Sequence, residues 1–203
     1  PLYSSAASDV YKRQLMMCLV ALGSFAPVYA SESVYTGEQM VMLLEQMDES
    51  LSEVQITEPG VKSWEVVTED GLTGTVTVET VAKEDSNLRA SNGLDKYKFN
   101  IGSSYTTTVT KDFLGGRFEV ITDWVYASGS NLKITGVDTY SKPPMLCTVG
   151  NTEKLINTKS GTWVKTTAST TWEFKGVPYT TETITKISII FDTGYNIGVS
   201  WWV

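Results

Sequence analysis

The sequence predicts a mainly β fold: an antiparallel β-sandwich or up-and-down barrel of about eight or nine strands, with one N-terminal amphipathic helix. After residue 62 the chain is rich in Thr, Val, Ile, Tyr and Trp, with turn residues at short intervals. No second helical period follows the first. The last segment, Tyr195 to Val203, alternates apolar and polar residues, which is typical of antiparallel strands with one buried face.

The beginning of the chain is expected to lie outside the folded domain. Residues 1–14 are predicted to be a sequencing-adapter artefact, because Ser4 to Gln14 match a translated transposase adapter. Leu15 to Ala30 carry no charge and end in Val-Tyr-Ala, which is typical of a secretory signal peptide, here truncated before its basic start. This apolar run is shorter than the roughly 20 residues that span a bilayer. We therefore expect one mature domain, residues 31–203, secreted to the extracellular space or the cell surface.

The charge of this mature segment limits its partners. Without Asp9, Lys12 and Arg13 it holds 22 acidic and 14 basic residues, a net charge of −8. Such a surface repels phosphate backbones and anionic lipids, so we expect no nucleic-acid partner and no stable membrane insertion after signal cleavage. Cys147 is the only cysteine after residue 30, which excludes an intramolecular disulfide in the mature domain.

One helix is expected over residues 37–50. Thr36 and Gln39 have the spacing of a capping box. Apolar side chains then recur at helical spacing, and this stripe is expected to pack on a sheet: Met40, Leu43, Leu44, Met47 and Leu51. The opposite, polar face is formed by Glu38, Glu45, Asp48, Glu49 and Glu53.

The β body, about residues 62–203, divides at its turn residues. Glu69-Asp70-Gly71 predicts a hairpin between residues 63–68 and 73–82, and the polar residues 83–95 predict an exposed loop. Further strands are expected at residues 96–101, 118–126, 132–140, 162–174, 179–192 and 195–203. The layout is broadly similar to small exported β proteins of Gram-positive bacteria, a resemblance that rests on no diagnostic motif and transfers no site residue.

Several catalytic chemistries are excluded. The chain has no histidine, so Ser-His-Asp and Cys-His catalysis and histidine-ligated zinc are ruled out. Carboxylates are the only candidates for a catalytic pair, and four of them are expected on strands: Glu65, Glu119, Asp123 and Glu173. Their spacing selects no two of them. A calcium site at residues 84–87 lacks EF-hand spacing. We therefore expect no enzyme, no metal and no cofactor, with a carboxylate-based glycoside hydrolase as an alternative.

Aromatic residues indicate a binding function instead. All six tryptophans lie in the β body, and the neighbours Trp201 and Trp202 must point to opposite faces of a strand. Trp202 is expected on the more polar face, where an exposed ring could stack on a sugar or anchor a protein. The sequence thus predicts an extracellular binding module for a carbohydrate, such as a cell-wall or extracellular glycan, or for a protein. The candidate ligand-binding residues are Trp202, Trp124 and Tyr126.

A second function class stays open at this point. A barrel of about eight strands can enclose an apolar ligand, so the protein could be a small carrier. Its cavity would be lined by Trp124, Tyr126 and Ile134.

Overall fold

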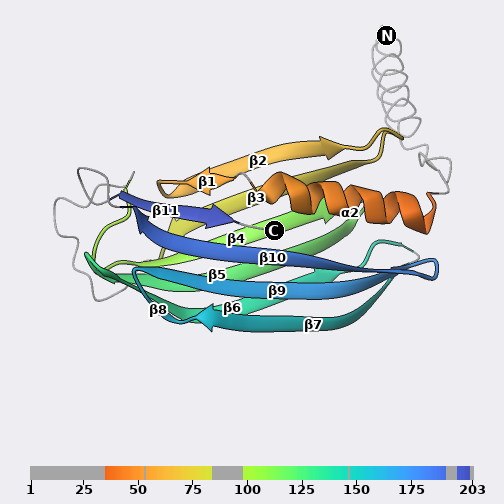
Figure 1. The fold of residues 1–203 in the computed structure, drawn as a ribbon. Coiled ribbons are helices and arrows are strands. Elements are labelled where there is room, and N and C mark those ends of the chain that lie inside the picture. The colour runs from red at the N-terminus through yellow and green to blue at the C-terminus, as the bar shows by residue number, and fades with distance from the viewer. Residues whose placement is uncertain (1–34, 53, 84–97, 146, 191–195, 202–203) are drawn as a thin grey trace, which may run out of the picture. The chain divides into compact units, whose positions relative to one another are not determined.

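The computed structural model describes residues 35–52, 54–83, 98–145, 147–190 and 196–201 (Figure 1). It confirms the predicted fold class: over these residues the chain is mainly β, with two antiparallel sheets and one helix near the N-terminus. By its contacts the chain divides after Tyr35, and every element named below lies in the second unit. No helix in the described part is both long enough and apolar enough to cross a membrane.

The strands form two sheets, the arrangement of a β-sandwich. Sheet A has the order β1 (Gln55–Ile56), β11 (Asn196–Trp201), β10 (Val177–Ile190), β9 (Trp163–Phe174) and β7 (Cys147–Thr158). Sheet B has the order β2 (Gly60–Val67), β3 (Thr73–Ala82), β4 (Ser104–Phe113), β5 (Gly116–Ser128), β6 (Asn131–Lys142) and β8 (Ser160–Gly161). All recorded strand pairs are antiparallel. Within the described residues, nine strands have six residues or more and two have only two.

Helix α2 (Gly37–Leu51) begins at the predicted capping box. The Thr36 hydroxyl accepts from the Gln39 amide at 3.2 Å, and the Gln39 side chain accepts from the Thr36 amide at 3.0 Å. The predicted apolar stripe is buried along its whole length, from Met40 to Leu51. The expectation for Asp48 was wrong: it is 5 % exposed, because this side of the helix faces β10 and not solvent.

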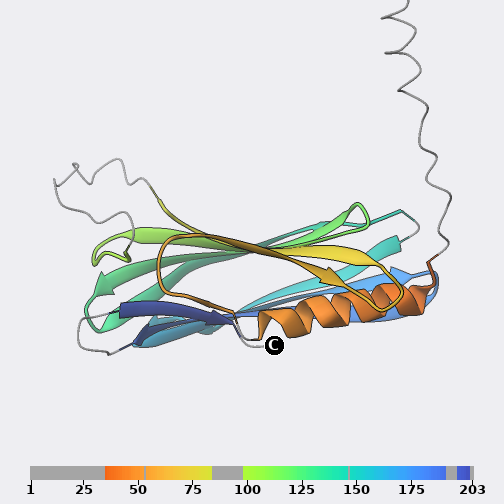
Figure 2. The same ribbon diagram turned by 90° about the horizontal axis from the view of Figure 1, so that it is seen from above.

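Helix α2 takes the place of a strand beside β10. β11 pairs with residues 185–190 of β10, and α2 packs against the same strand. In Figures 1 and 2, β11 and α2 lie one after the other along β10. The helix thereby covers part of a sheet edge that would otherwise expose unpaired backbone groups.

Among the described strands, the long strands β4 and β7 and the two-residue strands β1 and β8 were not predicted from the sequence. β7 begins after Pro144 in a segment with no clear alternation, and β4 has threonine and lysine at inward positions. Conversely, a strand was expected at 96–101, but Lys98–Ile101 form a bend and turn. Gly102, with φ of +84°, turns the chain into β4. The alternating apolar and polar residues before it therefore do not form a strand.

The interior of the sandwich contains many hydroxyl groups beside its apolar side chains. Eight threonines on the inner faces are buried: Thr80, Thr107, Thr122, Thr166, Thr170, Thr181, Thr183 and Thr185. The Thr122 and Thr166 hydroxyls form a hydrogen bond of 3.2 Å between the two sheets, and Thr107 bonds Thr80 at 3.1 Å. Hydrogen bonding offsets the desolvation of the paired hydroxyls and fixes their orientation, whereas the Thr183 and Thr185 hydroxyls have no partner among the described residues.

Candidate functional site

The structure places two of the three candidate ligand-binding residues inside the sandwich. Trp124 is fully buried and Tyr126 is 1 % exposed. The Trp124 ring stacks on Tyr105 with centroids 4.6 Å apart, and its indole N–H donates to the Thr107 hydroxyl at 3.0 Å. Trp202 lies outside the described residues. A ligand-binding role for these three residues stays a prediction, and the two described rings offer no surface to solvent.

The carboxylates considered for hydrolysis lie on several strands. Glu119 binds Arg117 at 3.1 Å, and Asp123 binds Lys83 at 2.8 Å and Thr106 at 2.7 Å. Glu65 is on β2 and Glu173 on β9, in different sheets. Residues 84–87 lie outside the described part of the chain. Within that part, no group of three or more cysteine, aspartate or glutamate side chains is placed to hold a metal ion.

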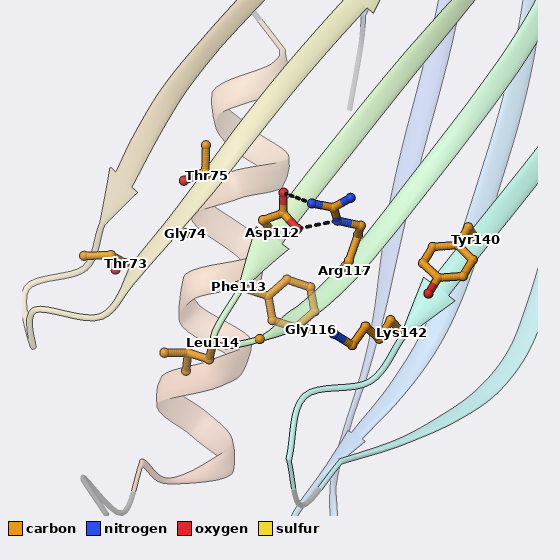
Figure 3. A pocket seen from close by; sticks show the side chains of 11 residues that line it. Thr73, Gly74, Thr75, Asp112, Phe113, Leu114, Gly116, Arg117, Tyr140 and Lys142 are labelled. Carbon is orange, nitrogen blue, oxygen red and sulfur yellow. Dashed lines mark hydrogen bonds and ion pairs between the residues drawn. The ribbon is translucent and has the colours of Figure 1, made fainter. Parts of the chain in front are cut away.

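A shallow pocket of about 640 Å³ lies on sheet B beside the turn that joins β4 to β5 (Figure 3). We call this the β4–β5 concavity. Its lining is formed by Thr73, Gly74, Thr75, Asp112, Phe113, Leu114, Gly115, Gly116, Arg117, Tyr140 and Lys142. Most of these side chains are polar, so the site suits a hydrophilic ligand better than an apolar one.

Strand register explains why these residues meet. Thr75 is opposite Asp112, Asp112 is opposite Arg117, and Arg117 is opposite Lys142, so one row crosses four neighbouring strands. Side chains alternate between faces, so residues directly opposite one another share a face. A parallel row places Tyr140 opposite Glu119, two residues away along the strands. Residues distant in sequence therefore form a single polar surface.

Arg117 is held in a defined orientation. Its Nε and Nη2 atoms donate to the two Asp112 carboxylate oxygens at 2.6 and 3.0 Å, and Nη1 donates to Glu119 at 3.1 Å. These bonds, chiefly those to Asp112, raise the pKa of the Arg117 guanidinium. Such a planar bidentate pair is fixed in geometry, and its side chains remain 45 % and 38 % exposed. It can present donors and acceptors together to ligand hydroxyl groups.

Two features of the concavity carry no evident structural benefit. Arg117 and Lys142 are like charges directly opposite one another, an arrangement that destabilises a sheet. Tyr140 is 50 % exposed. Its side chain lies on the same side of the sheet as Arg117 and Lys142 (Figure 3). The other exposed aromatic that the structure describes, Trp163, has the Lys186 ammonium 5.8 Å from its ring centroid. Tyr140 is therefore the better candidate for ligand contact.

The concavity is closed at one end by the tight turn between β4 and β5. Leu114 and Gly115 both have positive φ, 46° and 80°, as a two-residue hairpin turn of right-handed twist requires.

We predict that Gly115→Ala lowers the free energy of unfolding by about 1–2 kcal/mol, because a side chain disfavours this backbone region. Urea unfolding measures the change. Gly150→Ala is the control: its φ is not positive, and an added Cβ meets only ordinary contacts at 3.5 Å.

Sequence reasoning did not find this site. Arg117 and Asp112 look like ordinary charges around a turn, and Tyr140 and Lys142 follow 23 and 25 positions after Arg117. Only the register of four strands brings them together. The available signal was the Leu-Gly turn at residues 114–115, which would have fixed the β4–β5 register and paired Asp112 with Arg117.

Comparison with protein-family models, with curated proteins and with solved structures gave no match.

Proposed function

We propose that the protein is an extracellular binding module that recognises a saccharide carrying an acidic group in the β4–β5 concavity. One observation carries this proposal: the exposed Tyr140 ring shares a concave surface with the fixed Arg117–Asp112 pair and the Lys142 ammonium. An aromatic ring can stack on the apolar face of a sugar. The paired charges and the threonine hydroxyls then offer both donors and acceptors for sugar hydroxyl groups.

The acidic group is proposed from the charge pattern. The lining contains two cations, Arg117 and Lys142, and one carboxylate, Asp112. Arg117 is already bound by Asp112 and Glu119, whereas no ion pair is recorded for Lys142 among the described residues. Lys142 is thus the group that suits a ligand carboxylate or phosphate.

The proposal is tested by screening the full-length protein on an array of neutral and acidic glycans, including cell-wall fragments. We expect an acidic glycan to bind, and Tyr140→Ala to weaken its binding about tenfold, which corresponds to about 1.4 kcal/mol. Lys142→Gln should weaken the binding of acidic glycans more than the binding of neutral ones. Trp163→Ala is the matched control on sheet A and should leave affinity unchanged. Absence of any glycan ligand, or equal binding by Tyr140→Ala, would contradict the proposal.

A further inference from the structure

A lysine and an aspartate are in direct contact inside the domain, and neither of them lines the β4–β5 concavity. Lys111 on β4 has a side chain that is 1 % exposed, and Asp48 on α2 one that is 7 % exposed. The Lys111 Nζ atom contacts the Asp48 Oδ1 atom directly. The two residues are 63 positions apart, so any bond between them would tie the helix to sheet B.

Two hydroxyl groups from β10 complete the cluster. The Thr181 Oγ1 atom accepts from Lys111 Nζ at 2.9 Å and donates to Asp48 Oδ1 at 2.8 Å. The Tyr179 hydroxyl donates to Asp48 Oδ2 at 2.9 Å. The Lys111 amine also donates to the Glu182 carbonyl oxygen at 3.3 Å. The Lys111 amine and the Asp48 carboxyl group are therefore in contact with each other. Each of the two hydroxyls lies within hydrogen-bonding distance of the carboxyl group, and the Thr181 hydroxyl also bonds the amine.

We propose that Lys111 and Asp48 condense without any other protein to form an intramolecular isopeptide bond that joins α2 covalently to β4. This goes beyond the proposed binding function and does not depend on it. Within the described residues Cys147 is a free cysteine, so no disulfide joins the elements of this part of the chain. The product is a secondary amide between the Lys111 Nζ and Asp48 Cγ atoms.

The reaction balances without a cofactor or oxidant. A proton first moves from the Lys111 ammonium through the Thr181 hydroxyl to Asp48, which gives a neutral amine and a carboxylic acid. The Nζ lone pair then attacks Cγ, and the charge that develops on Oδ2 is stabilised by the Tyr179 hydroxyl. The Cγ–Oδ1 bond breaks, a second nitrogen proton goes to Oδ1, and one water molecule leaves. The amide nitrogen retains one hydrogen.

Burial favours the reactive form of two of these groups. Desolvation lowers the pKa of Lys111, and the charge of Asp48 offsets this only in part. The neutral amine, which is the nucleophile, therefore forms at a lower free-energy cost than it does in water. Desolvation, together with the Asp48 charge, raises the pKa of Tyr179, which keeps its hydroxyl available as a donor. Holding two reacting groups in contact can be equivalent to an effective concentration on the order of 10⁵ M or more. The Phe118 ring, 5.8 Å from Nζ, helps to exclude water.

Intact mass spectrometry of the denatured full-length protein tests the proposal. We expect a mass lower than that of the unmodified chain by one water molecule. A protease digest should contain a branched peptide that joins the segments around Asp48 and Lys111, with no tryptic cleavage at Lys111. A full-mass protein without this branched peptide would overturn the proposal, and neither result requires a variant to fold.

Two sets of variants make the result specific. Lys111→Met removes the nucleophile and should restore the full mass. A cyclic imide at Asp70-Gly71 would also remove one water molecule, but it would persist in Lys111→Met and would then count against the proposal. Thr181→Val and Tyr179→Phe should slow the appearance of the lighter species after synthesis while leaving Lys111 and Asp48 in place. Unchanged rates in both variants would contradict the roles given to these two hydroxyls.

Discussion

The double variant Lys111→Met/Asp48→Asn should be more stable than the single variant Lys111→Met by about 3 kcal/mol, although it contains one more substitution. The single variant leaves the Asp48 carboxylate buried without its cation. In the double variant, the amide oxygen introduced at position 48 can still accept from Tyr179 and Thr181, while the uncompensated charge is gone. Burying an isolated charge is much less favourable than burying a hydrogen-bonded amide.

Urea unfolding of both variants at neutral pH measures this difference. Both lack the lysine amine, so the comparison concerns the buried charge alone and holds whether or not the wild-type protein carries the isopeptide bond. Equal stability of the two variants would mean that water reaches Asp48. In that case the buried environment on which the condensation depends would also be in doubt.

Replacing Trp124 by alanine should lower the free energy of unfolding by about 3–5 kcal/mol. The ring is fully buried, it stacks on Tyr105 and lies 5.3 Å from Phe99, and its N–H is bonded to Thr107. Alanine would leave a large cavity and free the Thr107 hydroxyl from one of its partners. Trp124→Phe should lower the free energy of unfolding by less than Trp124→Ala, because most of the ring volume remains.

The measurement is again urea unfolding, with Trp163→Ala as the control on an exposed tryptophan. That substitution should change stability by no more than about 0.5 kcal/mol. The same experiment separates two interpretations of Trp124. If Trp124→Ala folds with nearly wild-type stability but loses ligand binding, the role predicted from the sequence is favoured over a packing role.

Much of the fold follows from local periodicity. The capping residues Thr36 and Gln39 and the stripe ending at Leu51 were enough to place α2 within one residue of its observed end. The strand expected at residues 118–126 likewise lies within β5, and Phe118, Val120, Trp124 and Tyr126 form its buried face. In each case, one face of the element is apolar over most of its length. The spacing of its apolar residues therefore indicates a helix or a strand from the local sequence alone.

β4 was missed because it has polar residues in the core, whereas β7 has no buried residue that could mark an inward face. β4 has Thr107 and Lys111 at inward positions, and these groups are stabilised by partners on other elements: Trp124 for the first and Asp48 for the second. A hydrophobic pattern cannot show such positions, because the compensating partner lies far away in sequence. For the same reason Asp48 looked like a solvent-facing helix residue. The β4–β5 concavity was missed because it depends on register across four strands.

The unpaired long edges of the two sheets have a consequence for behaviour at high concentration. β7 and β2 are the terminal strands of sheets A and B among the described elements, and each could template the addition of a foreign strand. β7 has adjacent opposite charges, Glu153 and Lys154, at its centre, and irregular register on either side of them. β2 has Lys62 and Glu65. The charges on both strands, and the irregular register of β7, oppose the addition of a further strand at either edge.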